Sequence, residues 1–156
     1  MPQQTVYLAS PLGFSPEYGP YLVRIKQHLA GLGYAIFDPW EQSLFGAEIA
    51  SAGAIESFLE RVAAFRRIAE DIGRCNEAGI IRSDLLLAVL DGAEVDSGTA
   101  SEVGFASALG KPCYGLRTDL RDCGDFVGVP INLQVIRFIE RSGGVLFRSI
   151  AEIDMS

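Results

Sequence analysis

The chain has 156 residues, of which 49% are hydrophobic and 21% are charged, proportions that are ordinary for a globular domain. This length predicts one domain, spanning residues 1–156, with a core of common size. A formal net charge of −7 argues against DNA or RNA as the main partner, because no basic surface could neutralise the phosphates.

The first half of the chain predicts two strands and two helices. Thr5–Ala9 is a short β-rich run, and residues 10–20 predict a loop because they hold three prolines and two glycines. Tyr21–Ala30 has helical periodicity, and Tyr34–Phe37 predicts a second strand. A long helix is expected over Ile55–Ile81. The predicted apolar face of that helix carries Phe58, Val62, Phe65, Ile68 and Ile72.

The second half predicts three strands and two helices. Leu85–Leu90 is apolar at every position, which is typical of a central strand covered on both faces. Thr99–Leu109 predicts a helix, and Pro112–Leu116 predicts the next strand. A fifth strand is expected at Val135–Ile139, and a final helix is expected after Gly143-Gly144.

Strands that alternate with helices indicate a parallel sheet with right-handed crossovers. We therefore expect a single-domain α/β fold of the doubly wound, flavodoxin-like or Rossmann-like kind, with a five-stranded parallel sheet and flanking helices. Ligands of such folds bind beyond the carboxyl ends of the strands. Those ends carry Ser10-Pro11, Asp38 and the acidic loop at residues 91–98, so polar side chains should meet at one edge.

The chain carries no sign of a membrane or secretion segment. The longest apolar run, Leu85–Leu90, is too short to span a bilayer, and the N-terminus shows no signal sequence. Cys75, Cys113 and Cys123 are odd in number and lack close metal-type spacing. We expect a cytoplasmic protein with reduced thiols.

Several enzyme classes lose support because their residues are missing. The sequence contains neither a phosphate loop nor a Gly-x-Gly-x-x-Gly run after the first strand, which argues against ATP and dinucleotide cofactors. His28 is the only histidine, so a histidine-based triad or a zinc site is not expected. We therefore expect no metal and no cofactor. The remaining carboxylates, hydroxyls and amides suit chemistry at the anomeric carbon of a sugar.

The stretch DSGTASEVGF, residues 96–105, allows two interpretations of Glu102. In the first, Thr99 and Glu102 form a helix capping box, in which each side chain bonds to the backbone amide of the other. In the second, Glu102 is a nucleophile that the helix dipole keeps ionised. The local pattern alone favours the cap. A carboxylate bonded back to Thr99 would not be free to attack a sugar.

Four segments together resemble the nucleoside 2-deoxyribosyltransferase family. They are DSGTASEVGFASALGKP, the opening VYLAS, the Asn76-x-x-Gly79 region before Asp84, and Pro130-Ile131-Asn132-Leu133. The resemblance extends roughly over residues 5–140 and is most specific at residues 96–104. It implies a five-stranded parallel sheet with flanking helices. It also implies transfer of 2-deoxyribose between nucleobases through a covalent intermediate on a glutamate, with retention at the anomeric carbon.

The resemblance implies a role for three residues in catalysis. Glu102 falls on the family's nucleophile, Asp96 falls on the aspartate that holds sugar hydroxyls, and Tyr7 falls on the tyrosine that hydrogen-bonds the nucleophile. From the residues alone, Asp96 could equally be a helix cap or a turn residue, and Tyr7 could be a packed strand aromatic.

The resemblance also implies residues that bind the substrate. Asn132 falls on an asparagine that reaches into a neighbouring subunit's site in many members, which implies a homo-oligomer with shared sites. Asn76 departs from the family, whose well-studied members carry an aspartate there that contacts the base and helps to protonate it. An amide is no general acid at neutral pH, so the usual base preference does not carry over. The full set of expected substrate contacts is Ser10, Phe14, Asn76, Gly98, Asn132 and Gln134.

Other roles stay open at this stage. Phe14 and Trp40 are candidates for stacking on a base, although Trp40 could equally be a packed loop anchor. Asp84, at a strand start, is expected to be structural, and Asp38 has no assigned role. The expected substrates are deoxynucleosides and free nucleobases.

Two alternative functions remain besides base exchange. One is the related N-glycosidase reaction, the hydrolysis of 2-deoxynucleoside 5′-monophosphates, which needs a phosphate pocket. The loop after the first strand offers Ser10 and Ser15 for it but no lysine or arginine. The other is a non-catalytic nucleotide-binding module, which would keep its ligand affinity without Glu102.

Overall fold

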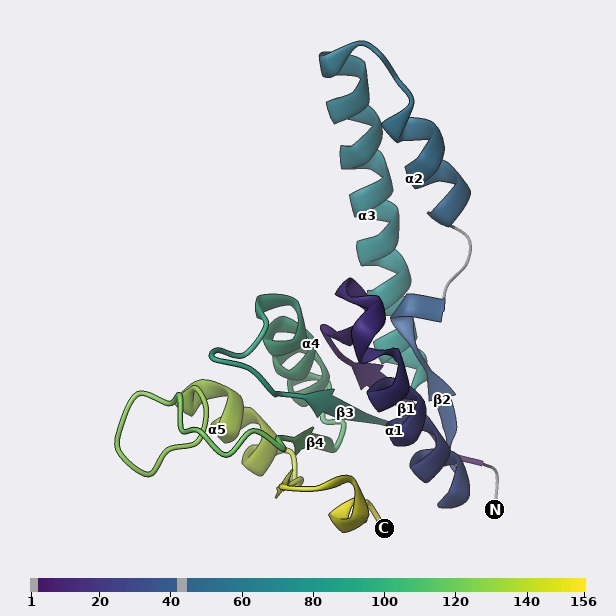
Figure 1. Ribbon diagram of the computed structural model, residues 1–156. Helices are drawn as coiled ribbons and strands as arrows, with labels where there is room; N and C mark the ends of the chain where they lie inside the picture. Colours follow the sequence, from purple (N-terminus) through teal and green to yellow (C-terminus); the bar gives the residue numbers. More distant parts are fainter. Residues whose placement is uncertain (1–2, 42–44) are drawn as a thin grey trace.

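The computed structural model describes residues 3–41 and 45–156 and contains a five-stranded parallel sheet (Figure 1). The strand order is β2-β1-β3-β4-β5, and every neighbouring pair is parallel. The strands are β1 (Thr5–Ala9), β2 (Ala35–Phe37), β3 (Leu85–Val89), β4 (Cys113–Leu116) and β5 (Leu146–Phe147). The predicted fold class is thereby confirmed.

Helices cover both faces of this sheet. They are α1 (Gly19–Gly31), α2 (Gly46–Gly53), α3 (Phe58–Arg82), α4 (Ser97–Ala108) and α5 (Leu133–Arg141). Alternate residues of β1 and β3 point to opposite faces, because successive side chains of a strand alternate. Helix α1 packs on the face of Val6 and Leu87, and helices α4 and α5 pack on the face of Tyr7 and Leu86. The hydrophobic core therefore has two parts, one on each face of the sheet.

The predictions for the last quarter of the chain are wrong. Val135–Ile139 belongs to helix α5, and the segment after Gly143-Gly144 forms strand β5 followed by a short 3₁₀ helix at Ile150–Glu152. In α5 the residues that pack on the core, Val135 and Ile139, are four apart and lie on one face of the helix. The β-branched run resembles a strand only when that spacing is ignored.

The helix predicted at Ile55–Ile81 exists as α3, but only one of the five residues of its predicted apolar face is buried. Ile68 is buried, whereas Phe58 and Phe65 are 67% and 39% exposed. The reason is that the N-terminal part of α3 packs against the unpredicted helix α2 and projects with it away from the sheet (Figure 1). Only the C-terminal end of α3 meets the sheet, where Gly79 lies against the ring of Phe37.

Candidate active site

A cavity of about 320 Å³ opens beyond the carboxyl ends of β1, β2 and β3, where the fold predicts a ligand. It contains six of the nine residues that the sequence proposed for the site. The lining residues are Ser10, Phe14, Pro39, Trp40, Ile72, Asn76, Asp96, Gly98, Thr99 and Glu102. Tyr7 reaches it through a contact with Glu102 from the strand below.

The Tyr7 hydroxyl donates a hydrogen bond of 2.6 Å to Oε1 of Glu102. Tyr7 is fully buried in the centre of the sheet and stacks on Phe37, with 5.4 Å between the ring centroids. Such packing leaves the Tyr7 ring few rotamers, so the hydroxyl holds the carboxylate at a defined place at the cavity wall.

The capping-box interpretation of Glu102 is wrong. Asp96, not Thr99, caps helix α4: its Oδ2 accepts bonds from the Thr99 backbone N at 2.9 Å and from the Thr99 hydroxyl at 3.1 Å. Thr99 is thus the third residue of the helix, and the carboxylate of Glu102 bonds to Tyr7 instead. Both cap contacts use the same oxygen of Asp96.

The ionisation of Glu102 and Tyr7 follows from their surroundings. Burial raises the pKa of the Glu102 carboxyl, the hydrogen bond from Tyr7 lowers it, and the negative charge of Asp96 raises it again. Burial and the charge of Glu102 raise the pKa of the Tyr7 hydroxyl far above its usual range. At neutral pH the tyrosine is therefore the proton donor in this bond and Glu102 the acceptor.

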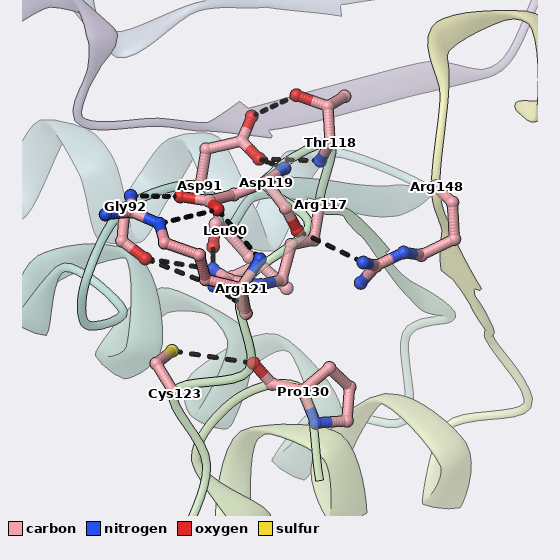
Figure 2. Close-up of polar contacts among 10 residues, drawn as sticks. All are labelled: Leu90, Asp91, Gly92, Arg117, Thr118, Asp119, Arg121, Cys123, Pro130 and Arg148. Carbon is pink, nitrogen blue, oxygen red and sulfur yellow. Dashed lines mark hydrogen bonds and ion pairs between the residues drawn. The ribbon is translucent and has the colours of Figure 1, made fainter. Parts of the chain in front are cut away.

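The loop between β3 and α4, which leads to Asp96, is held by a buried arginine that the sequence analysis did not single out (Figure 2). Arg117 is fully buried at the end of β4. Its guanidinium donates to the carbonyl oxygens of Leu90 at 2.6 Å, Gly92 at 3.2 Å and Arg121 at 2.6 Å. A charged residue after a strand is usually exposed, so no local pattern points to this role.

Asp91 ties the same loop to the segment after β4 (Figure 2). Its Oδ1 accepts bonds from the backbone N of Thr118 at 2.6 Å and of Asp119 at 2.7 Å. Its Oδ2 accepts a bond of 2.9 Å from the Tyr21 hydroxyl on helix α1. Together, Asp91 and Arg117 fasten the ends of β3 and β4 to each other.

Asn132 and Gln134 lie outside the cavity that Glu102 lines. Asn132 is the N-cap of α5, and its Oδ1 accepts bonds from the backbone N of Gln134 at 2.9 Å and of Val135 at 3.4 Å. Both residues line a different cavity of about 640 Å³, bounded by α4, α5 and the loop before α5. Within one chain they do not meet the other predicted site residues.

The loop after β2 carries two further residues of interest, Trp40 and Asp38. Trp40 is 42% exposed, donates from Nε1 to the carbonyl of Ser10 at 2.7 Å, and contacts the ring of Phe14 edge-on. Asp38 is buried in an ion pair with Lys26 and accepts a bond from the backbone N of Trp40. Both therefore anchor the loop after β2.

Asp84 is structural, as expected: its Oδ2 accepts a bond of 2.7 Å from the backbone N of Thr5.

Within residues 3–41 and 45–156, no group of three or more His, Cys, Asp or Glu side chains is placed to hold a metal ion. In the same ranges no helix is long and apolar enough to cross a membrane.

A family model described as nucleoside 2-deoxyribosyltransferase matches residues 6–134. The chain belongs to this family. The resemblance to this family is thereby confirmed. Members of the family are glycosyl-transferring enzymes that act on nucleosides and nucleobases. A comparison with curated proteins gives no match.

Solved structures share the nucleoside 2-deoxyribosyltransferase fold over nearly the whole chain. A conserved protein from Enterococcus faecalis V583 is 25% identical, with a TM-score of 0.66 and coverage of 97% of this chain and 94% of its own. A 2-deoxyribosyltransferase from Bacillus psychrosaccharolyticus is 24% identical, with a TM-score of 0.60 and coverages of 97% and 93%. The CMP N-glycosidase of Clostridium botulinum is 14% identical, with a TM-score of 0.51 and coverages of 96% and 94%. The last two show likeness of fold.

Proposed function

We propose that the chain moves 2-deoxyribose from one nucleobase to another through an ester on Glu102, with retention at the anomeric carbon. The observation that carries this proposal is the contact between Tyr7 and Glu102, which holds a half-buried carboxylate at the cavity wall. Attack by a positioned carboxylate on a sugar carbon gives a covalent intermediate and splits one difficult substitution into two easier ones.

In the first step, an oxygen of Glu102 bonds to C1′ while the bond from C1′ to the base nitrogen breaks, and its electron pair leaves with the base. In the second step, the nitrogen of another base attacks C1′ and releases the carboxylate. Two inversions give net retention. Asp96, whose two cap bonds both use Oδ2, has Oδ1 available as an acceptor for a sugar hydroxyl.

Asn76 lines the cavity where family members carry an acid, and an amide donates and accepts hydrogen bonds without giving up a proton. The departing base therefore takes its proton from solvent. This favours bases that are stable as anions when they leave, and bases that are already protonated on the ring before the bond to C1′ breaks.

The two enzymatic candidates, transfer and hydrolysis, separate in one experiment. The protein is incubated with a deoxynucleoside, with and without a second free base, and the products are identified by chromatography and mass. Formation of the second deoxynucleoside supports transfer. Release of the free base and 2-deoxyribose 5-phosphate from a deoxynucleoside 5′-monophosphate, with no exchange when a base is added, would instead favour the glycosidase. No cleavage, with ligand affinity retained, would favour a binding module.

Replacing Tyr7 with phenylalanine is expected to move the acid limb of the pH profile of kcat/KM to higher pH. The reason is that the bond from Tyr7 lowers the pKa of Glu102, so its loss raises that pKa, and the ionised nucleophile disappears at a higher pH as the solution is acidified. The measurement is kcat/KM between pH 4 and 8 for both proteins. An acid limb that stays in place would show that the limb does not report Glu102.

The assembly is proposed to be a homo-oligomer in which Asn132 completes the site of a neighbouring subunit. Its exclusion from the chain's own cavity is consistent with a contribution to another copy. We expect Asn132→Asp to keep the stability of α5, because aspartate is an equally good N-cap, while removing the amide donors and weakening deoxynucleoside binding. Asn132→Ala should additionally lower the free energy of unfolding by about 1 kcal/mol.

A subunit-mixing test isolates the shared site. Glu102→Ala subunits are combined with Asn132→Asp subunits under conditions that permit exchange, and the activity of the mixture is compared with the sum of the parents. Sites that pair an intact Glu102 with an intact Asn132 should raise the activity above that sum. Activity equal to the sum, despite proven exchange, would place Asn132 outside the site.

The proposed cellular setting is the cytoplasm. Cys75, Cys113 and Cys123 are all free thiols in the structure, which fits a reducing compartment.

A further inference from the structure

A second cavity of about 310 Å³ adjoins the one that contains Glu102. The two share four lining residues: Pro39, Trp40, Ile72 and Asn76. The second cavity then continues onto helix α2, which supplies Gly46 and Ile49, with Phe45 just before it. We call this second cavity the apolar chamber.

The order of the lining residues gives the site a direction. Glu102 and Asp96 line only the first cavity, Asn76 and Trp40 line both, and Ile49 lines only the apolar chamber. A deoxynucleoside with C1′ at Glu102 therefore extends its base toward Asn76 and Trp40. A group attached to the base on the edge away from the sugar would point into the apolar chamber.

The chemistry of the apolar chamber is hydrophobic. Among its described lining residues, Asn76 has the only polar amide and none is charged. Ile49 and Trp40 are 44% and 42% exposed, so large apolar surfaces face solvent beside a cavity. Covering such surface with an apolar group is favourable, because it removes apolar area from water on both partners.

We propose that the apolar chamber binds an alkyl or aryl substituent on the distal edge of the nucleobase. The preferred substrates would be deoxynucleosides, and the preferred acceptors free bases, that carry such a group. This rests on the proposed function for the placement of the sugar at Glu102. The occupant is argued from the continuity of the apolar chamber with the catalytic cavity, and Asn76 at their junction contacts the polar edge of the base.

The test is a binding series of adenines with straight alkyl groups of increasing length on the exocyclic nitrogen. Trp40 is the only tryptophan of the chain and lines both cavities, so its fluorescence reports occupancy directly. Each methylene that enters the apolar chamber should tighten binding about fourfold, equivalent to ~0.8 kcal/mol. Affinity that stays level or falls with chain length would overturn the proposal.

Two variants place the effect in the apolar chamber and keep a single tryptophan. Ile49→Phe partly fills the chamber and should flatten the dependence of affinity on alkyl length. The matched control is Ile81→Phe, on an exposed isoleucine (52%) that lines neither cavity, and it should preserve the dependence. If affinity in Ile49→Phe still rises with alkyl length as steeply as in the original protein, the proposal is overturned.

Failure of the inference and failure of the proposed function are distinguishable. The fluorescence series needs no turnover, so a rising affinity without glycosyl transfer would reject the enzyme reaction and keep the apolar chamber. Transfer to adenine with no gain along the series would keep the reaction and reject the apolar chamber.

Discussion

Glu102→Ala is expected to lower the rate of the proposed deoxyribosyl transfer by about 10⁴-fold or more, the size of loss that follows removal of a covalent nucleophile. Among the described residues that line the cavity, no other carboxylate is in an equivalent place: Asp96 caps helix α4, whereas Tyr7 orients Glu102. The measurement is product formation from a deoxynucleoside and a second base under single-turnover conditions. A residual rate within tenfold of the original would show that the nucleophile is misassigned.

A matched variant separates catalysis from stability. Glu102→Gln keeps an oxygen that accepts the Tyr7 bond but cannot form the ester in the same way, so it should be as inactive as the alanine variant. Glu102→Ala leaves the buried Tyr7 hydroxyl without its acceptor, which costs about 1–3 kcal/mol. The Tm of Glu102→Gln should therefore be higher than the Tm of Glu102→Ala. An active Glu102→Gln enzyme would contradict a covalent role.

Arg117→Met is expected to destabilise the fold by about 3 kcal/mol or more. The substitution leaves the buried carbonyl oxygen of Leu90 and the partly buried ones of Gly92 and Arg121 without their shared donor. An unsatisfied buried carbonyl costs about 1–3 kcal/mol, and the two partly buried ones add to that cost. For a domain of this size the loss corresponds to a fall in Tm of roughly 10 °C. Because the loop that leads to Asp96 would lose its anchor, the activity at a permissive temperature should fall as well.

The control for this prediction is Arg121→Met, four residues further along. The Arg121 side chain is 73% exposed and pairs with the half-buried carboxylate of Asp119, while its backbone carbonyl still accepts the Arg117 bond after the substitution. An ion pair with an exposed partner contributes little, so the Tm should fall much less than in Arg117→Met. Equal losses in Tm for the two variants would show that the buried contacts of Arg117 do not stabilise the loop.

The elements with the strongest local patterns were predictable from sequence. The apolar run at Leu85–Leu90 contains β3, because a strand buried on both faces is apolar at every position. The periodic stretch Tyr21–Ala30 falls within α1, because a helix buried on one face has apolar residues at a helical spacing. The run at Val135–Ile139 is too short for its period to outweigh its β-branched residues. Its state depends on the cap at Asn132 and on packing against α4, which only the folded chain provides.

The candidate site divides in the same way. The sequence alone predicted a site made of carboxylates, hydroxyls and amides, and it determined that Glu102 and Asp96 follow a central strand. The tertiary structure decided which partner Glu102 takes, because Tyr7 is 95 residues away and only strand pairing and helix packing bring the two together. It also decided the burial of Arg117 and the apolar chamber beside α2, since both arise where distant segments meet and neither leaves a period or motif in the chain.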